Sequence, residues 1–404
     1  MDRVLATHVG SLVRPQPVRE LRAAITRGEE VDEAAYEQAL ADAVAEVVRM
    51  QAEAGIDVVD DGEMSKDSWI TYLYERVRGI EQRLVPLDGM DLLPPSRDRQ
   101  AFPEFYAEHD AELARAMENR VRVGGGDAEA PTAEAKLWFC TGPVEYDGSA
   151  VERDIARLRT ALAGVEVEDA FLPVVAPASV YWLRNEHYAS EEELVFALAD
   201  ALHDEYAAIV EAGFLLQVDD AVLMHEYDSI LSLGGSVEDY RRWAKLRVEA
   251  LNHALAGIPE ERVRYHVCFG SWHGPHAYDP PLADVVDLIL EVNARFYLIE
   301  QANPRHEHEW RLWETVALPE GKVLVPGVVT HHTNVVEHPE LVAERLVRLA
   351  GLVGRERVMA GTDCGFAQAS PVQRVHPSIQ WAKLEALAEG ARIATRQLWG
   401  RTAA

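Results

Sequence analysis

The sequence predicts an α/β protein in which eight parallel strands close into a (β/α)8 barrel of the TIM type, with residues 1–404 forming one domain. Short β-type runs alternate with long amphipathic helical patterns, and polar residues gather just after the strand-like runs. The expected strands are Val4–Ala6, Ile56–Val59, Phe171–Val175, Phe214–Val218, Val263–Val267, Phe296–Ile299, Val323–Pro326 and Val358–Ala360.

Four long segments between these strands carry apolar residues at spacings of three and four, which is typical of amphipathic helices. Ser236 is expected to cap one of them, because a serine hydroxyl can accept a hydrogen bond from a free N–H of the first turn. Gly55 and Gly213 follow two others and lead directly into strands. The expected helices are Tyr36–Ala54, Glu191–Ala212, Ser236–Ala256 and Pro339–Leu352.

One stretch, from about residue 84 to residue 154, does not follow the alternation of strands and helices. It contains Pro94-Pro95, Gly124-Gly125-Gly126 and a hairpin pattern around Val121–Val144. We interpret it as an insertion subdomain near the mouth of the barrel.

The amino-acid composition argues against several classes of binding partner. A formal net charge of −29 argues against nucleic acids and anionic membrane surfaces. The first residues lack the apolar core of a signal peptide, and no apolar run approaches the length of a membrane span. Three cysteines make a disulfide framework improbable. We therefore expect a soluble cytoplasmic protein that acts on small molecules. The exposed helix faces are also compatible with a homo-oligomer.

Polar side chains follow seven of the expected strands. Because the carboxyl ends of barrel strands meet at one mouth, groups from several strands can share a single active site there. The segments concerned are Thr7–Ser11, Asp60–Glu63, Asp219-Asp220, His266–Cys268, Glu300–Asn303, Thr330–His332 and Thr362–Cys364.

Three of these side chains are suited to one metal ion. His266 precedes Cys268 by one intervening residue, and Cys364 follows the last expected strand. An imidazole and two thiolates suit Zn²⁺, with a fourth position left for a carboxylate, water or substrate. The combination predicts a zinc enzyme that acts on thiols. The alternative for each cysteine is an ordinary buried side chain, which we expect for Cys140.

The motifs THVGS, DGE, LQVDDAVL, HVC, IEQAN and GTDCGF cover most of the chain, and together they resemble the catalytic barrel of the cobalamin-independent methionine synthases. The resemblance implies a zinc ion held by His266, Cys268, Glu300 and Cys364. It also implies contacts to the thiol substrate from Val9, Ser11, Glu63 and Asp219, and His332 as the proton donor.

The chemistry of these groups is consistent with that resemblance. Zinc keeps a thiol of ordinary pKa, about 8.5, deprotonated at neutral pH. Glu63 and Asp219 could receive the ammonium group of an amino-acid thiol such as homocysteine. His332, assisted by Asp219 or Asp220, could protonate the leaving group. We expect a zinc-dependent thiol alkyltransferase, more specifically an S-methyltransferase of the methionine-synthase type. It would form a thioether such as methionine from a homocysteine-like thiol and a small-molecule donor, either a methyl-folate or another methyl donor.

Two other functions stay open. Single-barrel relatives include the epoxyalkane:coenzyme M transferases and related carbon–sulfur lyases, whose sulfonate substrate would call for Arg14, Lys66 or Arg184 at the mouth. A non-catalytic structural zinc protein is the third hypothesis, although structural sites are usually richer in cysteine.

Three further histidines have two interpretations each. His8 either orients the first loop or touches substrate. The pair His306 and His308 forms either the polar start of a helix, which we favour, or a second metal site.

Overall fold

A computed structural model describes residues 1–86, 95–116, 121–123, 133–180, 183–271, 273–369 and 375–400. Its main sheet holds seven strands in the order β1-β5-β7-β8-β9-β10-β11, and every neighbouring pair is parallel. The strands are β1 (Val58–Asp60), β5 (Asp169–Val175), β7 (Leu215–Asp219), β8 (Val263–Val267), β9 (Phe296–Ile299), β10 (Val323–Val329) and β11 (Gly361–Thr362).

The first residues of the chain close this sheet into a barrel. Ala6 forms a parallel bridge with Ala360, and Thr7 forms one with Val58. The Thr7 N–H donates to the Ala360 carbonyl at 2.9 Å, and the Asp57 N–H donates to the Ala6 carbonyl at the same distance. The segment therefore lies between β11 and β1 as an eighth strand. The predicted (β/α)8 barrel is confirmed.

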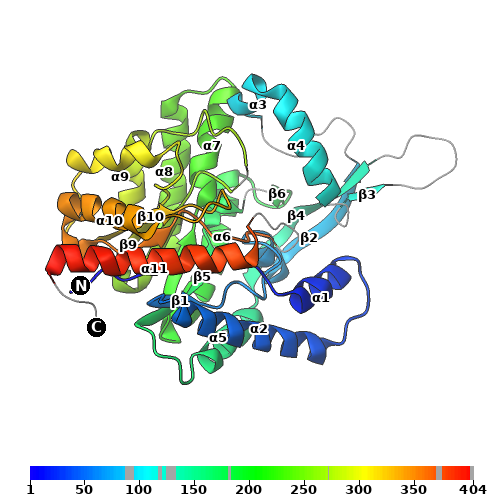
Figure 1. Cartoon of the computed structure of the whole chain (residues 1–404). Coiled ribbons are helices and arrows are strands. Elements are labelled where there is room, and N and C mark those ends of the chain that lie inside the picture. Colours follow the sequence, from blue (N-terminus) through cyan, green and yellow to red (C-terminus); the bar gives the residue numbers. More distant parts are fainter. Residues whose placement is uncertain are drawn as a thin grey trace.

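Helices surround the strands (Figure 1). They are α1 (Gln16–Thr26), α2 (Glu33–Glu53), α5 (Ser149–Ala161), α6 (Glu191–Glu211), α7 (Ala221–Ser232), α8 (Val237–Ala254), α9 (Val286–Leu290), α10 (Pro339–Val353) and α11 (Pro377–Trp399). Short 3₁₀ segments are η1 (Thr71–Glu75), η2 (Pro177–Ser179), η3 (Glu260–Arg262), η4 (Leu282–Asp284), η5 (Glu307–Glu314) and η6 (Arg355–Arg357). None of the described helices is long and apolar enough to cross a membrane.

The sequence signals for helix ends are confirmed. The Ser236 side chain accepts a hydrogen bond from the Asp239 N–H, and the Asp239 side chain accepts one from the Ser236 N–H, which is a capping box. Gly55 and Gly213 have φ of +87° and +94°, the left-handed conformation that ends a helix at little steric expense for glycine.

β8 and β9 have the predicted bounds, whereas the other barrel strands are shifted or lengthened by a few residues. β1 begins at Val58 instead of Ile56, because the Ile56 N–H still bonds to the Gln51 carbonyl at 3.0 Å, within the turn that ends α2. The last strand is Gly361–Thr362, and Val358 is joined to Leu324 only by an isolated bridge.

The predicted insertion contains a small antiparallel sheet, β2-β4-β3, with the short strand β6 pairing parallel to β4. Its elements are β2 (Val77–Pro86), α3 (Arg97–Ala101), α4 (Pro103–Ala116), β3 (Val121–Val123), β4 (Ala133–Tyr146) and β6 (Leu183–Asn185). β3 and β4 form the expected hairpin, whereas the long pairing of β2 with β4 was not predicted. Pro94 and Gly124–Gly126 lie outside the described residues.

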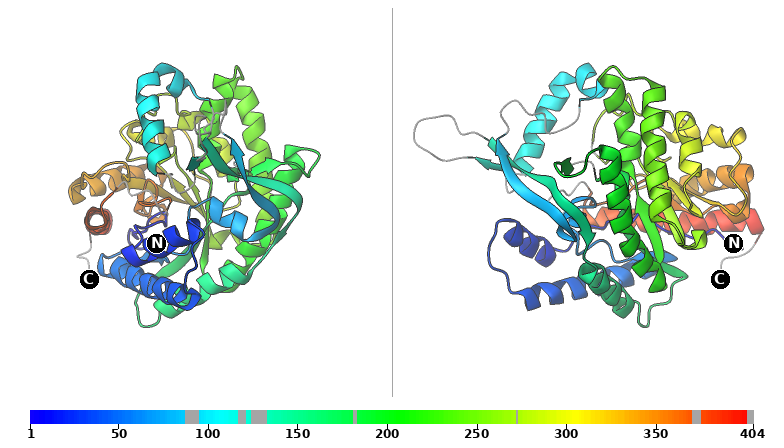
Figure 2. Two further views of the ribbon diagram at one scale, coloured as in Figure 1. Left: turned by 90° about the vertical axis from the view of Figure 1, so that its right-hand side faces the viewer. Right: turned by 180° about the vertical axis from the view of Figure 1, so that it is seen from behind.

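This sheet and helices α3 and α4 stand at the end of the barrel away from the N-terminus (Figures 1 and 2). The Asp98 carboxylate accepts a hydrogen bond from the Ala277 N–H at 3.1 Å, and Arg97 pairs with Asp228 at 2.6 Å. Ala277 and Asp228 follow the carboxyl ends of β8 and β7, so the insertion lies near the mouth as predicted. The sheet begins at Val77, and α5 packs on α2. A separate subdomain over 84–154 stays a prediction.

Two apolar clusters correspond to the two faces of the barrel strands. The larger one packs strands against helices. The smaller one fills the barrel interior and consists of Val9, Val58, Phe171, Leu215, Cys268, Leu298, Val323, Val325, Met359 and Cys364. Because side chains alternate along a strand, Arg264, His266 and Cys268 of the β8 segment share the interior face.

Arg264 is the main charged side chain at the floor of that interior. Its guanidinium lies 3.7 Å from the centre of the Phe171 ring and donates to Thr7 Oγ1 at 3.0 Å and to the His8 carbonyl at 2.8 Å. Burial lowers its pKa to about 9, and the charges of Asp60 and Asp219 act in the opposite direction. Arg264 therefore binds the closing segment of the barrel to β8.

We predict that Arg264→Met destabilises the protein by about 3 kcal/mol, because it leaves buried acceptors and carboxylates without their cation. Urea unfolding would measure the change. The matched control is Arg153→Met, which removes an arginine that is 54% exposed, and it should change stability by less than about 0.5 kcal/mol. Equal losses in the two variants would contradict the role of Arg264.

Candidate metal centre

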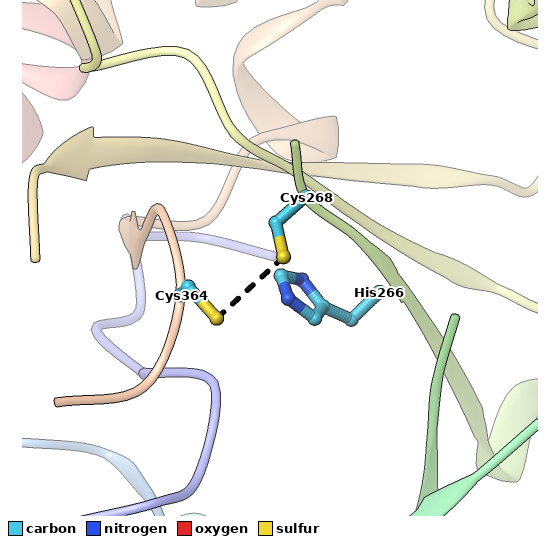
Figure 3. Close-up of side chains that lie close together, drawn as sticks. All are labelled: His266, Cys268 and Cys364. Carbon is cyan, nitrogen blue, oxygen red and sulfur yellow. Dashed lines mark hydrogen bonds between the residues drawn. The ribbon is translucent and has the colours of Figure 1, made fainter. Parts of the chain in front are cut away.

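Three predicted ligands from two strand ends meet at the top of the barrel interior. His266 is in β8, Cys268 follows it directly, and Cys364 follows β11 (Figure 3). The two Sγ atoms are 3.6 Å apart, and the ligand atoms of the three residues all lie within 4.8 Å of one another. All three residues are buried.

The donor set fits a tetrahedral zinc ion. With Zn–S bonds of about 2.3 Å, two thiolates on such an ion lie about 3.8 Å apart, close to the spacing found here. Within the part of the chain that the structure describes, neither ring nitrogen of the buried His266 has a hydrogen-bond partner of ordinary geometry, and the ring interacts instead with the Cys364 thiol. A buried imidazole without such a partner is unfavourable unless another group, such as a metal ion, binds it.

The two cysteines differ in their protonation. The Cys268 thiol donates to Cys364 Sγ, which holds the pKa of Cys364 well below its usual range and raises the pKa of Cys268 well above it. The hydroxyl of Ser271 also donates to Cys364 Sγ, at 3.2 Å. Cys364 is therefore prepared as a thiolate ligand. Ser271 was not predicted, and its only sequence signal is its position just after HVCFG.

Glu300, the predicted fourth ligand, follows β9 and is fully buried beside the other three. Its Oε2 accepts the Phe269 N–H at 2.9 Å, and its Oε1 lies 3.1 Å from the Asn303 amide nitrogen and 3.2 Å from His332 Nε2. The ligand atoms of Glu300, His331 and His332 all lie within 4.8 Å of one another. The carboxylate therefore belongs to this candidate group and not to the group that contains the two thiols. Its role as a zinc ligand stays a prediction that requires the carboxylate to turn.

Burial and hydrogen bonding act on Glu300 in opposite directions. Burial raises the pKa of this carboxyl, but the contacts with His332 and the Phe269 N–H outweigh it and hold the pKa below its usual range. Glu300 is therefore ionised at neutral pH, as a metal ligand must be.

Two buried carboxylates, Glu63 and Asp219, lie close enough to His266 and Cys364 to interact with their charges. Burial raises the pKa of Glu63 and raises that of Asp219 to about 8. Gln217 donates to Asp219 Oδ1 at 3.0 Å and also bonds to the Val9 carbonyl, so it ties together two predicted substrate contacts. Gln217 was not predicted, although it shares a strand face with Asp219.

The Asp-Gly-Glu turn that carries Glu63 is conformationally strained. Gly62 and Glu63 have φ of +67° and +55°, and a positive φ is unusual for glutamate. The Asp61 carboxylate accepts the Glu63 N–H at 2.9 Å, and Arg14 donates to the Glu63 carbonyl at the same distance. Such strain persists only where neighbouring contacts impose it, and it is common at functional sites.

The loop with Val9 and Ser11 packs directly on the loop that carries Cys364. A Cβ atom on Gly365 would lie 2.0 Å from Ser11 Oγ, so only glycine fits there. The Phe366 N–H donates to the Ser11 carbonyl at 2.7 Å. Ser11 is therefore held beside the loop that carries Cys364, and its contact with a substrate stays a prediction.

Comparison with known proteins agrees with this geometry. The family model "Cobalamin-independent synthase, Catalytic domain" matches residues 4–85 and 139–385. The chain belongs to the cobalamin-independent synthase family. It is accordingly an enzyme, and the unmatched residues 86–138 lie within the predicted insertion.

Three similar proteins each share less than a quarter of their aligned residues with this family member. A methionine synthase from Sulfolobus acidocaldarius is 24% identical over 89% of this chain and 85% of its own length. A 2-hydroxypropyl-CoM lyase from Xanthobacter autotrophicus is 23% identical over 92% of this chain and 90% of its own. A B12-independent methionine synthase structure from Shewanella sp. W3-18-1 superposes with a TM-score of 0.71 and 20% identity, covering 99% and 100% of the two chains. That likeness supports the fold.

Two further residues that were candidates for the site of this synthase-family enzyme, His8 and Asp220, form hydrogen bonds within the protein. His8 Nε2 bonds to Gln51 Oε1 at 2.7 Å, and His8 Nδ1 accepts the Gly10 N–H at 3.1 Å, so His8 orients the first loop. Burial lowers its pKa to about 4, which keeps it neutral. Asp220 accepts hydrogen bonds from Ser179 and Tyr265, at 2.7 and 2.9 Å.

The three side chains that could bind a sulfonate group have different surroundings in the structure. Arg14 donates to the carbonyls of Glu63, Lys66 and Ala367 and so joins two mouth loops. Lys66 bonds to the Pro173 carbonyl and lies 4.3 Å from the centre of the Tyr72 ring. Arg184, on β6, is exposed.

The predicted polar helix start at His306 is confirmed, since His306 immediately precedes η5. Its ring bonds to Asp279 and Glu309, whereas His308 is exposed. His306 and His308 are in neither of the two candidate metal-ligand groups among the described residues.

Asp363 sets the spacing between two strand ends of the metal centre. Its Oδ1 accepts the N–H groups of Gln301 and Ala302 at 2.9 and 2.7 Å, and it directly precedes Cys364. A Cβ on Gly327 would lie 2.0 Å from the same oxygen, so the β10 backbone also packs against it. These contacts fix Cys364 relative to the loop that begins at Glu300.

We predict that Asp363→Ala lowers zinc affinity about 10- to 100-fold, the usual effect of losing a group that orients metal ligands. Competition with a chelating dye would measure it. Asp200→Ala, which removes a carboxylate 72% exposed on α6, should leave the affinity unchanged. Unchanged affinity in Asp363→Ala would show that this hydrogen-bonded spacing does not matter.

Proposed function

We propose that the enzyme is a zinc-dependent S-methyltransferase that alkylates an amino-acid thiol of the homocysteine type. The observation that carries the proposal is the cluster of His266, Cys268 and Cys364 next to two buried carboxylates, Glu63 and Asp219. A site that only stabilised the fold would not need those carboxylates. The family membership points to the same chemistry.

His266, Cys268 and Cys364 would hold the ion, with Glu300 as the fourth, replaceable ligand. Zinc bound there would lower the pKa of a substrate thiol, so that its sulfur is a nucleophile at neutral pH. The interior position of the three ligands keeps the sulfur at the base of the mouth and away from bulk water.

Glu63 and Asp219 would bind the ammonium group of the acceptor. Their pKa values are raised by burial, and an ammonium group between them would restore the ionised forms. Gln217 donates to Asp219 and also bonds to the Val9 carbonyl, so it ties the Asp219 carboxylate to the first loop. The set therefore favours a thiol with a free amino group over a simple thiol.

His332 would supply the proton that the leaving group needs. Its ring lies beside Glu300, with Nε2 3.2 Å from Oε1, and its side chain is 11% exposed. That position suits an acid facing an incoming donor from the mouth. A methyl-folate, whose leaving nitrogen takes up a proton, fits this arrangement.

A coenzyme M transferase reaction is the second candidate, because a 2-hydroxypropyl-CoM lyase is among the relatives. A sulfonate would need a cation in the acceptor site. Arg14 is engaged by three carbonyl groups, and Lys66 lies on Tyr72 with a bond to the Pro173 carbonyl. These contacts favour the ammonium-bearing acceptor.

We also propose that the enzyme works in the cytoplasm. Cys268 and Cys364, with sulfurs 3.6 Å apart, could oxidise to a disulfide and lose the metal, and a reducing compartment prevents this.

We predict that the zinc-loaded protein forms methionine from homocysteine with a methyl-folate donor, measured by mass spectrometry, and that Glu63→Gln lowers kcat/KM for homocysteine about tenfold or more. The variant should change the rate for 4-mercaptobutyrate, which lacks the ammonium group, by less than about threefold. Glu46→Gln, at an exposed position on α2, is the matched control.

Cys364→Ser should abolish turnover and lower zinc content in the same assays. Normal activity in Cys364→Ser would refute the metal centre. An equal effect of Glu63→Gln on both thiols would refute the assignment of Glu63 to the ammonium group. Faster turnover with coenzyme M and propylene oxide than with homocysteine would favour the second candidate.

A further inference from the structure

A second group of ionisable residues lies beside the metal centre, on the loops that follow β8 and β9. Two of its members, His276 and His306, are buried, and the side chains of the other two, Asp279 and Glu309, are each 10% exposed. His276 Nδ1 is 2.8 Å from Asp279 Oδ2, and His306 Nε2 is 3.0 Å from the same oxygen. His306 Nδ1 is 3.0 Å from Glu309 Oε2. We call His276, Asp279, His306 and Glu309 the histidine–carboxylate array.

The hydrogen bonds of the array define its protonation. Burial disfavours a charged His306, but its bonds to Asp279 and Glu309 raise its pKa to about 9, so both ring nitrogens donate at neutral pH. Burial also opposes ionisation of Asp279, yet the two histidines hold its pKa below the usual range. Asp279 is therefore an acceptor, and His276 must donate to it from Nδ1. The orientation of the His276 ring is fixed as a result.

The array touches the metal centre at two points. The ring of His276 meets the ring of His332 edge to face, with centroids 5.3 Å apart and planes at 79°. The ring of His306 stacks on Phe269 at 3.4 Å, with planes at 1°. Phe269 donates its N–H to Glu300 Oε2, and His332 Nε2 faces Glu300 Oε1. The array therefore contacts His332 directly and Glu300 through Phe269.

His276 occupies this position in a strained conformation. Its φ is +52°, although it is not glycine, and only 4% of the residue is exposed. A non-glycine residue in this region is strained and persists where surrounding contacts impose it, often at functional sites. The bond to Asp279, three residues along the chain, is one such contact.

From this geometry we infer that His276 is a positioning residue that holds the His332 ring in place for proton transfer, with Asp279, His306 and Glu309 fixing His276 in turn. The inference rests on the proposed function, in which His332 is the acid. In the step concerned, the acceptor sulfur forms a bond to the alkyl carbon, and the bond from that carbon to the leaving atom breaks. The electron pair goes to the leaving atom, which takes a proton from His332.

His276→Asn isolates the ring contact. The asparagine amide can still donate to Asp279, as His276 Nδ1 does, and asparagine tolerates a positive φ better than most residues. The variant should therefore fold, while the ring that touches His332 is lost. Asp279→Asn is the second variant, because it removes the charge that fixes His276 and keeps the side-chain volume.

Alkyl donors with different leaving groups distinguish proton transfer to the leaving group from alkylation of the thiol sulfur. When methyl iodide is the donor, the iodide ion departs without taking up a proton. The rate with methyl iodide therefore reports only on the sulfur nucleophile. The nitrogen of 5-methyltetrahydrofolate and the oxygen of propylene oxide must each take up a proton. Homocysteine is the thiol in every assay, with the zinc-loaded full chain.

With an acid-requiring donor, we expect kcat of His276→Asn to fall about tenfold or more, part of the 10²- to 10⁴-fold effect typical of general acids. The rate with methyl iodide should stay within about twofold, and Asp279→Asn should show the same selectivity. Zinc content and calorimetric binding of homocysteine should be unchanged. The control is His253→Asn on α8, where an exposed histidine pairs with Asp200 at 2.6 Å, and it should affect neither rate.

An equal loss with both kinds of donor, or no loss with the acid-requiring donor, would overturn the inference. If His276→Asn does not fold, the same comparison in Asp279→Asn decides the question. A wild-type protein that is inactive with methyl iodide and with both other donors would overturn the proposed function, and the inference with it.

Discussion

The metal centre depends on one geometric constraint, the convergence of parallel strand ends at the mouth of a closed barrel. Cys268 and Cys364 are 96 residues apart in the chain, yet their sulfurs are 3.6 Å apart. The alternation of side chains along the β8 segment places His266 and Cys268 on the interior face together with Arg264. The segment around Ala6 and Thr7 completes the barrel between β11 and β1, and Arg264 binds that segment from inside. Metal binding and barrel closure therefore share the same interior.

The interior is more charged than an ordinary protein core. Glu63, Asp219 and Glu300 are all buried within a few side chains of the two thiols. Burial raises the pKa of Glu63 and Asp219, whereas hydrogen bonds keep Glu300 ionised. Buried charges are unfavourable unless they are paired, hydrogen-bonded or bound to a ligand. Glu300 is therefore ionised through its hydrogen bonds, whereas burial favours the protonated forms of Glu63 and Asp219.

Much of the fold could be predicted from the sequence, because local patterns carry it. Apolar runs marked the barrel strands, and Ser236 and Gly213 marked helix ends through bonds within a few residues. The convergence of His266, Cys268 and Cys364 was also predictable, since strand ends of a barrel converge whatever the intervening sequence is. The strand pairing of β2 with β4 was not, because it joins segments some sixty residues apart with unpatterned sequence between them.

Side-chain orientation within the site was equally inaccessible from the sequence. The motif IEQAN indicated Glu300 but not that its carboxylate faces His332 and the Phe269 N–H. Asp279 and His306 are 27 residues apart, and their contact depends on how two mouth loops pack. Ser271 and Gln217 each form a hydrogen bond to a residue far along the chain, Cys364 and Val9, which no local pattern encodes.

X-ray absorption at the zinc edge would count the sulfur atoms around the ion in the zinc-loaded protein. We expect two sulfur ligands, from Cys268 and Cys364, in the free enzyme, and a third after homocysteine is added, as an oxygen ligand leaves. If the sulfur count does not change with homocysteine, the thiol is not activated at the metal and the proposed function is wrong.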